Sequence, residues 1–291
     1  MTPTPIEANE GPGKPWPPLP TPLSVPVADS HCHLDIALDA ERIGPPLDVQ
    51  QALDLAESVG VDRVVQIGCD VAGARWAVDV AQQDARLLAG VALHPNEAPR
   101  LASRDVLVDG FKVIEKLAQH ERVRAIGETG LDYFRTGPDG QAVQEESFRW
   151  HIDLAKRTKK ALVIHDRDAH DDVVRILLSE GAPEHVVFHC FSGGPDLADV
   201  CVTNGWVMSF SGTVTFNKNE HVRDALAIAP ADQLLVETDA PYLTPTPFRG
   251  RPNASYLIPH TIHAMSQVKG LDVDELCAIV NTTTTRVFGL W

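Results

Sequence analysis

Short apolar runs alternate with longer amphipathic segments along most of this chain. Eight such runs occur, at residues 25–30, 63–68, 87–93, 124–128, 161–165, 185–189, 206–211 and 234–237. Continuous apolar runs of this length are typical of strands buried on both faces of a parallel sheet. Segments between them, such as 49–59 and 142–158, have apolar residues at helical spacing, and 273–288 is predicted as the last helix. Eight strand–helix units over about 260 residues predict an α/β fold, a single-domain (β/α)8 TIM barrel.

The residues before the first predicted strand have a different composition. Proline is frequent in 1–24, where it removes amide donors and prevents helix formation. We therefore expect a flexible, proline-rich N-terminal arm over 1–24 and one barrel domain over 25–291. A doubly wound sheet is the rival architecture, but it would usually show a glycine-rich fingerprint after the first strand. The first strand here ends in Asp-Ser-His-Cys-His instead.

Ionisable residues directly follow several of the apolar runs. In a parallel barrel, the carboxyl ends of all strands open at one mouth, where active sites form. His31 and His33 are two residues apart in a strand, so their side chains project to the same side. The further candidates at strand ends are Glu128, His165, His189 and Asp239. Ionisable groups placed next to buried strands need partners, so we expect these side chains to converge.

This set is too large for one catalytic metal ion, which usually takes three protein ligands and water. Two divalent ions sharing a carboxylate would use it fully. Glu128 belongs to a strand between the two groups and is the predicted bridge. Imidazole ligands favour transition metals over magnesium. We therefore expect two divalent ions per chain, either Zn²⁺, Mn²⁺ or Mg²⁺.

Six segments of the chain resemble motifs of the TatD-type metal-dependent deoxyribonucleases. They read DSHCHLD, GETGLDYF, VIHDRDAH, HCFSGG, MSFSGT and VETDAPYL, in the family's order. The resemblance implies a metallo-hydrolase barrel in which His31, His33, Glu128 and Asp239 hold a first ion. It implies that His165 and His189 hold the second ion, with Glu128 shared. The loop Arg249-Gly250-Arg251-Pro252-Asn253 and the proline-rich arm depart from the family's pattern.

Four further residues are candidates for contacts with substrate. His94 ends the third predicted strand, and Arg167, Arg249 and Arg251 lie on loops at the mouth. Arginine suits phosphate because its planar fork donates two parallel hydrogen bonds. Asp132 and Asp168 are candidates for orienting the ligand histidines through hydrogen bonds.

The net charge of −15 argues against broad, non-specific binding to duplex DNA, which requires a basic face. Five cysteines without a CxxC pair favour a reducing compartment. The first ten residues show no secretory signal, and no apolar run is long enough to span a bilayer. We therefore expect a cytoplasmic protein with no membrane association and no obligate protein partner.

The combined prediction is a metal-dependent hydrolase acting on ester bonds, a deoxyribonuclease that cleaves phosphodiester bonds from single-stranded DNA ends. Glu128 and Asp239 are its predicted catalytic residues, with Asp239 accepting the proton of the attacking water. One alternative is a hydrolase of another ester or amide bond, of the amidohydrolase, lactonase or aminoacyl-ester type, on the same two-metal site. Fold alone cannot decide between these reactions. A non-catalytic binding protein is a second alternative, although all six ligand positions are filled.

Overall fold

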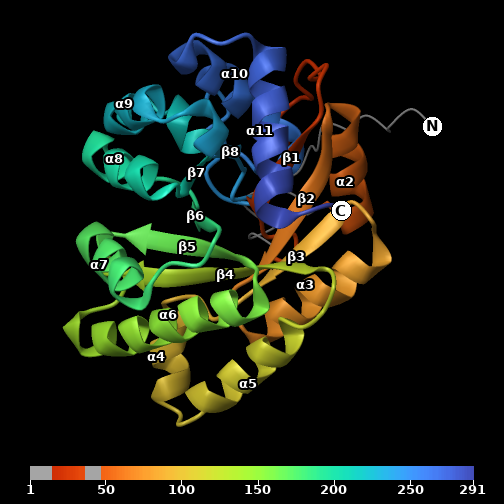
Figure 1. Cartoon of the computed structure of the whole chain (residues 1–291). Coiled ribbons are helices and arrows are strands. Elements are labelled where there is room, and N and C mark those ends of the chain that lie inside the picture. Colours follow the sequence, from red (N-terminus) through yellow and green to blue (C-terminus); the bar gives the residue numbers. More distant parts are fainter. Residues whose placement is uncertain (1–14, 37–46) are drawn as a thin grey trace.

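Eight parallel strands form one closed sheet in the computed structural model, which describes residues 15–36 and 47–291 (Figure 1). Each strand pairs with the next one along the chain. The strands are β1 (Val27–Cys32), β2 (Val61–Gly68), β3 (Leu87–Val91), β4 (Val123–Asp132), β5 (Ala161–Arg167), β6 (Val186–Phe188), β7 (Val207–Phe210) and β8 (Leu234–Val236). The predicted (β/α)8 barrel is confirmed.

The barrel closes between its first and last strands just beyond the end of β8. The amide of Asp239 donates to the carbonyl of His31 at 2.9 Å, and the amide of His33 donates to the carbonyl of Ala240 at 2.7 Å. These bonds attach the segment that carries Asp239 directly to β1. Two candidate site segments from opposite ends of the sequence are therefore adjacent in space.

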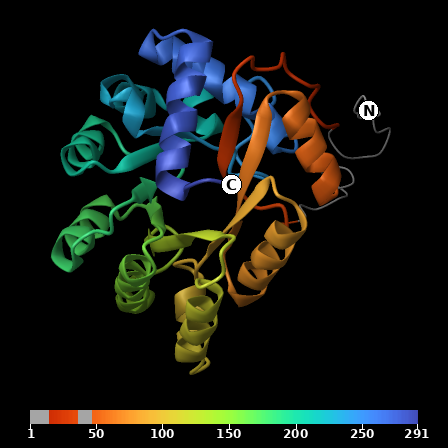
Figure 2. The ribbon, with the colours of Figure 1, turned by 45° about the vertical axis from the view of Figure 1, so that its right-hand side comes forward.

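Helices cover the outside of the sheet on all sides (Figure 2). They are α2 (Val49–Ser58), α3 (Val71–Gln83), α4 (Glu97–Ala102), α5 (Leu107–Leu117), α6 (Pro138–Thr158), α7 (His170–Glu180), α8 (Pro195–Asn204), α9 (Glu220–Ile228), α10 (Ile258–Lys269) and α11 (Val273–Phe288), with short 3-10 turns η1 (Gly212–Thr215), η2 (Ala231–Gln233) and η3 (Ser255–Leu257). Within residues 15–36 and 47–291, no helix is both long and apolar enough to cross a membrane.

Several strands extend further than the apolar runs predict. β4 continues past Glu128 to Asp132, because its pairing with β5 resumes at Thr129 and runs to the end of both strands. β1 likewise includes His31 and Cys32. His31, Glu128 and Asp132 therefore belong to hydrogen-bonded strand backbone, which holds them more firmly than a loop would.

The interior of the barrel is filled with small and branched apolar side chains at its amino-terminal end. This inner cluster is separate from the larger one between sheet and helices, and it consists of Val65, Ile67, Leu88, Ala125, Ala161, Val163, Val187, Val207, Leu235, Val287 and Phe288. Val287 and Phe288 come from α11 and cover that end. A Cβ on Gly127 would lie 2.5 Å from the Cβ of Val163, so this layer leaves no room for a side chain there. Polar chemistry is thereby confined to the opposite end.

The part of the proline-rich arm that the structure describes, residues 15–24, packs on the barrel without forming a helix or strand. The hydroxyl of Tyr256 donates to the carbonyl of Pro17 at 2.7 Å, and the amide of Leu23 donates to the carbonyl of Val59 at 3.0 Å. Leu23 is 7% exposed. Residues 1–14, for which flexibility was also expected, lie outside the described residues. The described part is anchored by these contacts.

Truncating Leu23 to alanine should lower the free energy of unfolding by about 2 kcal/mol, because the buried branched end of the leucine side chain is lost. Leu19 lies in the same segment but is 41% exposed. Leu19→Ala is therefore the matched control and should change stability by less than about 0.5 kcal/mol. Urea unfolding followed by circular dichroism measures both. Equal small effects would show that residues 15–24 do not pack on the barrel in solution.

His151 of α6 is fully buried and fixes the chain just after β3. Its Nε2 accepts a hydrogen bond from the amide of Leu93 at 3.1 Å, and its Nδ1 donates to the carbonyl of Ser147 at 2.8 Å. Burial lowers the pKa of His151 to about 4. Both ring nitrogens are thus used by a neutral imidazole, which is a structural role.

The depressed pKa of His151 predicts a specific loss of stability in acid. The unfolded chain binds a proton at this residue near pH 6.5, whereas the folded protein does so only near pH 4. Its contribution to stability is therefore present above pH 6.5 and is lost as the pH falls through this window. Between pH 7 and 5, wild type should lose about 2 kcal/mol more than His151→Gln, as measured by urea unfolding at each pH. Parallel pH profiles would mean that His151 already titrates normally in the folded state.

Candidate metal centre

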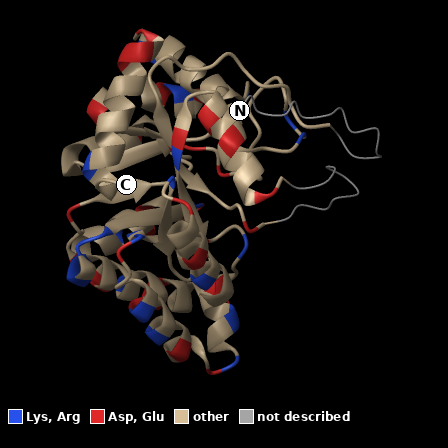
Figure 3. Ribbon diagram, turned by 90° about the vertical axis from the view of Figure 1, so that its right-hand side faces the viewer, with Lys and Arg blue, Asp and Glu red and all other residues tan. Residues whose placement is uncertain are grey.

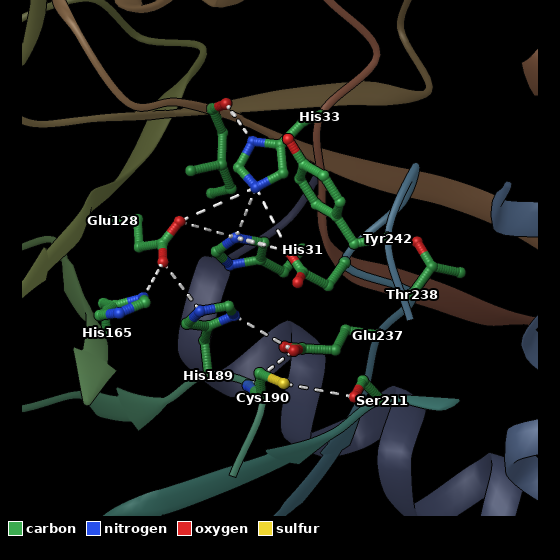
Figure 4. Close-up of polar contacts among 12 residues, drawn as sticks. His31, His33, Glu128, His165, His189, Cys190, Ser211, Glu237, Thr238 and Tyr242 are labelled. Carbon is green, nitrogen blue, oxygen red and sulfur yellow. Dashed lines mark hydrogen bonds and ion pairs between the residues drawn. The ribbon is translucent and has the colours of Figure 1, made fainter. Parts of the chain in front are cut away.

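The six predicted ligands converge at the carboxyl-terminal mouth of the barrel, and five of them, all except Asp239, are labelled in Figure 4. They come from β1, β4, β5 and the segments that follow β1, β6 and β8. The residues are His31, His33, Glu128, His165, His189 and Asp239. Most of this cluster is buried, but the side chains of His165 and Asp239 are 17% and 15% exposed. The site therefore opens to solvent at these two residues.

Glu128 lies at the centre of the cluster, and its two carboxylate oxygens face different histidines. Oε2 is 3.4 Å from His31 Nε2 and 3.8 Å from His33 Nε2. Oε1 is 2.5 Å from His165 Nδ1 and 2.9 Å from His189 Nε2. The carboxylate thus has one oxygen for each of the two histidine pairs that the sequence predicted.

Three of the histidines are oriented by hydrogen bonds on the ring nitrogen that points away from Glu128. His33 Nδ1 lies 3.0 Å from the carbonyl oxygen of Ile67, which can only accept, so this nitrogen carries the proton. The matching acceptors are Asp132 for His165 Nε2, at 3.2 Å, and Glu237 for His189 Nδ1, at 3.2 Å. In the neutral rings the inward nitrogens then carry lone pairs. Metal-binding histidines commonly show this arrangement.

The buried carboxylates and imidazole nitrogens of this site require positive charge nearby. Burial by itself would raise the pKa of Glu128. When no ion is bound and the rings are protonated, His189 and His94 and the hydrogen bonds that His165 and His189 then donate hold this pKa well below its usual value. Burial would lower the pKa of His33, yet Cys69 and Asp239 raise it well above the usual range. Cations or protons must therefore balance the carboxylates.

The geometry of the donor atoms fits divalent cations. His31 Nε2 and His33 Nε2 are only 3.3 Å apart, and His33 Nε2 is 3.3 Å from Asp239 Oδ1. Three sets of potential ligand atoms are close enough to share an ion, namely His31 with His33 and Glu128, His31 with His189 and Asp239, and His94 with Glu128 and His165. Imidazole nitrogen and carboxylate oxygen together suit zinc, manganese and related ions.

His94, which the sequence suggested as a substrate contact, lies within the third of these sets. Its Nε2 is 3.5 Å from Glu128 Oε1, and its ring packs edge-on against His165 at a centroid distance of 4.5 Å. Its Nδ1 accepts a hydrogen bond from the amide of Asn96 at 3.0 Å. His94 therefore faces the metal centre with a defined orientation, next to the exposed side of the site.

Among the described residues, none of the three candidate arginines forms a hydrogen bond or ion pair with a predicted ligand. Each guanidinium instead covers an aromatic ring: Arg167 lies 3.9 Å from the centre of Phe134, Arg249 lies 4.0 Å from Phe216, and Arg251 lies 5.5 Å from Phe248. A role in binding substrate stays a prediction for these residues. The aromatic partners were not foreseen in the sequence.

Glu237 and Cys69 are two members of the site that the sequence analysis did not single out. Glu237 is fully buried, and its Oε1 accepts from the amide of Cys190 at 2.6 Å as well as from His189. Cys69 Sγ lies 3.6 Å from Glu128 Oε2. Both residues were detectable by strand alternation, since Glu237 is two residues before Asp239 and Cys69 two after the inward-facing Ile67. Among the described contacts, Asp132 orients a ligand histidine, whereas none links Asp168 to one.

Comparison with known proteins supports this description. The family model described as "TatD related DNase" matches residues 28–289. The "Uncharacterized metal-dependent hydrolase TatD" of Mycobacterium tuberculosis is 43% identical over 271 residues, covering 91% of this chain and 98% of that protein. The "Uncharacterized metal-dependent hydrolase YabD" of Bacillus subtilis is 34% identical, covering 89% and 98%. The crystal structure of YJJV, a TatD homologue from Escherichia coli K12, superposes with a TM-score of 0.81 and 25% identity, covering 91% and 98%.

The barrel and the cluster of imidazoles and carboxylates at its mouth define the chain as a metal-dependent hydrolase. Within that class, it belongs to the TatD family. The family resemblance inferred from the six sequence motifs is therefore confirmed.

Replacing Glu128 with glutamine should sharply reduce the metal content of the protein. Glutamine preserves the shape but removes the negative charge that faces both histidine pairs. Elemental analysis after dialysis against a fixed concentration of Mn²⁺ or Zn²⁺ should show less than half of the wild-type content. Glu121→Gln, an exposed change just before β4, is the matched control and should bind as wild type does. Unchanged metal content in Glu128→Gln would remove Glu128 from the centre of the site.

Proposed function

We propose that this protein is a deoxyribonuclease that hydrolyses phosphodiester bonds at the ends of single-stranded DNA with two divalent ions. The observation that carries the proposal is the division of Glu128 between two histidine pairs, one for each carboxylate oxygen. A carboxylate shared by two ions is typical of enzymes that cleave phosphate esters by in-line displacement. The proposed ions are Zn²⁺, Mn²⁺ or Mg²⁺, with the histidines favouring the first two.

In this proposal six residues bind the two ions, and one of them, Asp239, also accepts a proton. His31, His33, Glu128 and Asp239 would hold one ion, and Glu128, His165 and His189 the other. When bound, such ions supply Lewis-acid polarisation of a phosphoryl oxygen and lower the pKa of water. Asp239 is partly exposed and reaches His33 and His31 with the same oxygen, Oδ1. These two observations support our assignment of its carboxylate as the acceptor of the proton of an attacking water.

The charge of the protein favours a small contact area with DNA. Acidic and basic residues both occur on the lower helices in Figure 3, whereas the upper helices have mostly acidic ones, and the chain carries a net charge of −15. Few phosphates can be neutralised by such a surface, so binding should depend mainly on the metal centre and the nearby arginines. A strand end, which presents few nucleotides, suits this footprint.

A substrate panel tests the proposal most simply. Purified, metal-loaded protein is incubated with end-labelled single-stranded DNA, circular single-stranded DNA, and ester, lactone, amide and aminoacyl-ester compounds. We expect shortening of the linear strand from an end, with the circle left intact. Hydrolysis of one of the other compounds without cleavage of DNA would contradict the proposal and favour another ester or amide bond as the target.

Asp239→Asn should lower kcat by about 10²–10⁴ while KM changes little. Asparagine preserves the shape and one oxygen donor, but it does not take up a proton in the working pH range, and loss of a general base typically costs this much. Rates are measured at saturating metal with bound ions counted, because loss of an ion would also slow the reaction. Asp79→Asn, an exposed change on α3, serves as the control. A kcat within about tenfold of wild type would show that Asp239 is a ligand and not the base.

A further inference from the structure

The arginines at the mouth differ from others of the barrel in their partners. Arg86, Arg149, Arg157 and Arg175 all form ion pairs with carboxylates. Arg167, Arg249 and Arg251 stack on aromatic rings, and no carboxylate in residues 15–36 and 47–291 lies within ion-pair distance of them. Their guanidinium groups therefore keep free hydrogen-bond donors beside an apolar ring.

Of the three arginine–aromatic pairs, Phe134 and Arg167 are the nearest in the sequence to residues of the metal centre, and a backbone hydrogen bond links their two segments. Phe134 lies two residues after Asp132, and the carboxylate of Asp132 contacts His165. Arg167 lies two residues after His165 on β5. The two segments are joined by the amide of Tyr133, which donates to the carbonyl of Arg167 at 2.9 Å. The pair is thus attached to the side of the site where His165 is exposed.

The ring of Phe134 is available to a ligand. Phe134 is 63% exposed although phenylalanine is usually buried, and the guanidinium of Arg167 lies 3.9 Å from the centre of its ring. Stacking of the guanidinium holds the ring in place. A planar group could stack on the exposed ring while Arg167 donates hydrogen bonds to an adjoining anion. A nucleotide carries both groups, a flat base and a phosphate.

We infer that Phe134 and Arg167 form a stacking subsite for an unpaired nucleobase next to the phosphate that is cleaved. The inference rests on the proposed function and adds to it the reason why the protein would select single-stranded DNA, namely recognition of an unpaired base. Bases within a duplex are already stacked on their neighbours, so only an unpaired or frayed base can reach an exposed ring. Stacking on an aromatic side chain is tolerant of sequence, because every base has a π face. The subsite therefore predicts preference for single-stranded ends with little preference among bases.

Binding of a fluorescent oligonucleotide tests this subsite separately from hydrolysis. The probes are short single-stranded oligodeoxynucleotides with hydrolysis-resistant phosphorothioate linkages and 2-aminopurine as the base at one end or the other. Stacking quenches 2-aminopurine fluorescence. A third probe lacks the terminal base. Metal-loaded wild type is compared with Phe134→Ala and Phe134→Trp, and with Val108→Ala, which removes an equally exposed apolar side chain from α5.

We expect wild type to quench one of the two end-labelled probes. Phe134→Ala should raise the Kd for that probe about tenfold and lose the quenching, as expected for one lost base stack. Phe134→Trp should restore both, and Val108→Ala should behave as wild type does. For the probe without the terminal base, wild type and Phe134→Ala should bind equally. Quenching that persists in Phe134→Ala would overturn the inference. So would a loss of affinity on removing the terminal base that is as large for Phe134→Ala as for wild type.

The same experiment separates this inference from the proposed function. Quenching that depends on Phe134, in a protein that cleaves no DNA, would support the subsite and contradict deoxyribonuclease activity. Cleavage of DNA without quenching would contradict the subsite and leave the activity in place. Absence of binding to all probes would overturn both.

Discussion

A negative charge buried inside the barrel is the constraint on which the site depends. Glu128 is 4% exposed, and a carboxylate removed from water at that depth is costly unless positive charge and hydrogen bonds surround it. Imidazole rings surround it within 4 Å, from His31, His33, His94, His165 and His189. Neutral imidazoles do not cancel a charge, whereas protonated imidazoles, or cations that the imidazoles share with the carboxylate, do. The demand for positive charge therefore arises from the packing of the barrel mouth itself.

The strand framework keeps these groups in place. The closure between β1 and the segment after β8 uses backbone bonds on His31, His33, Asp239 and Ala240. Beneath it, the buried carboxyl group of Asp29 accepts hydrogen bonds from the backbone amide and the hydroxyl of Thr238 and from the hydroxyl of Ser255. Burial raises the pKa of Asp29 to about 6 despite these bonds. The seam that positions Asp239 is thus tied together by polar groups, while the other end of the barrel is filled by apolar ones.

Sequence patterns were sufficient to predict the barrel and the convergence of six side chains, because strand ends in a parallel barrel meet at one mouth. They were insufficient where contacts depend on three-dimensional detail. β4 continues beyond Glu128 because it pairs with β5 there, and this pairing cannot be predicted from an apolar run. Strand alternation could place Glu237 at the mouth, but it could not show that Glu237 is the partner of His189, which lies 48 positions away in the chain. Likewise, the anchoring of residues 15–24 depends on Tyr256 and Val59, whereas proline content alone predicted a flexible arm without regular structure.

Anomalous diffraction from crystals of the protein grown with Mn²⁺ tests the central claim most directly, because it locates each ion relative to Glu128. The account predicts two peaks about 3.5–4 Å apart at the barrel mouth, with one Glu128 oxygen beside each. A single peak, or a second ion away from the Glu128 carboxylate, would contradict it.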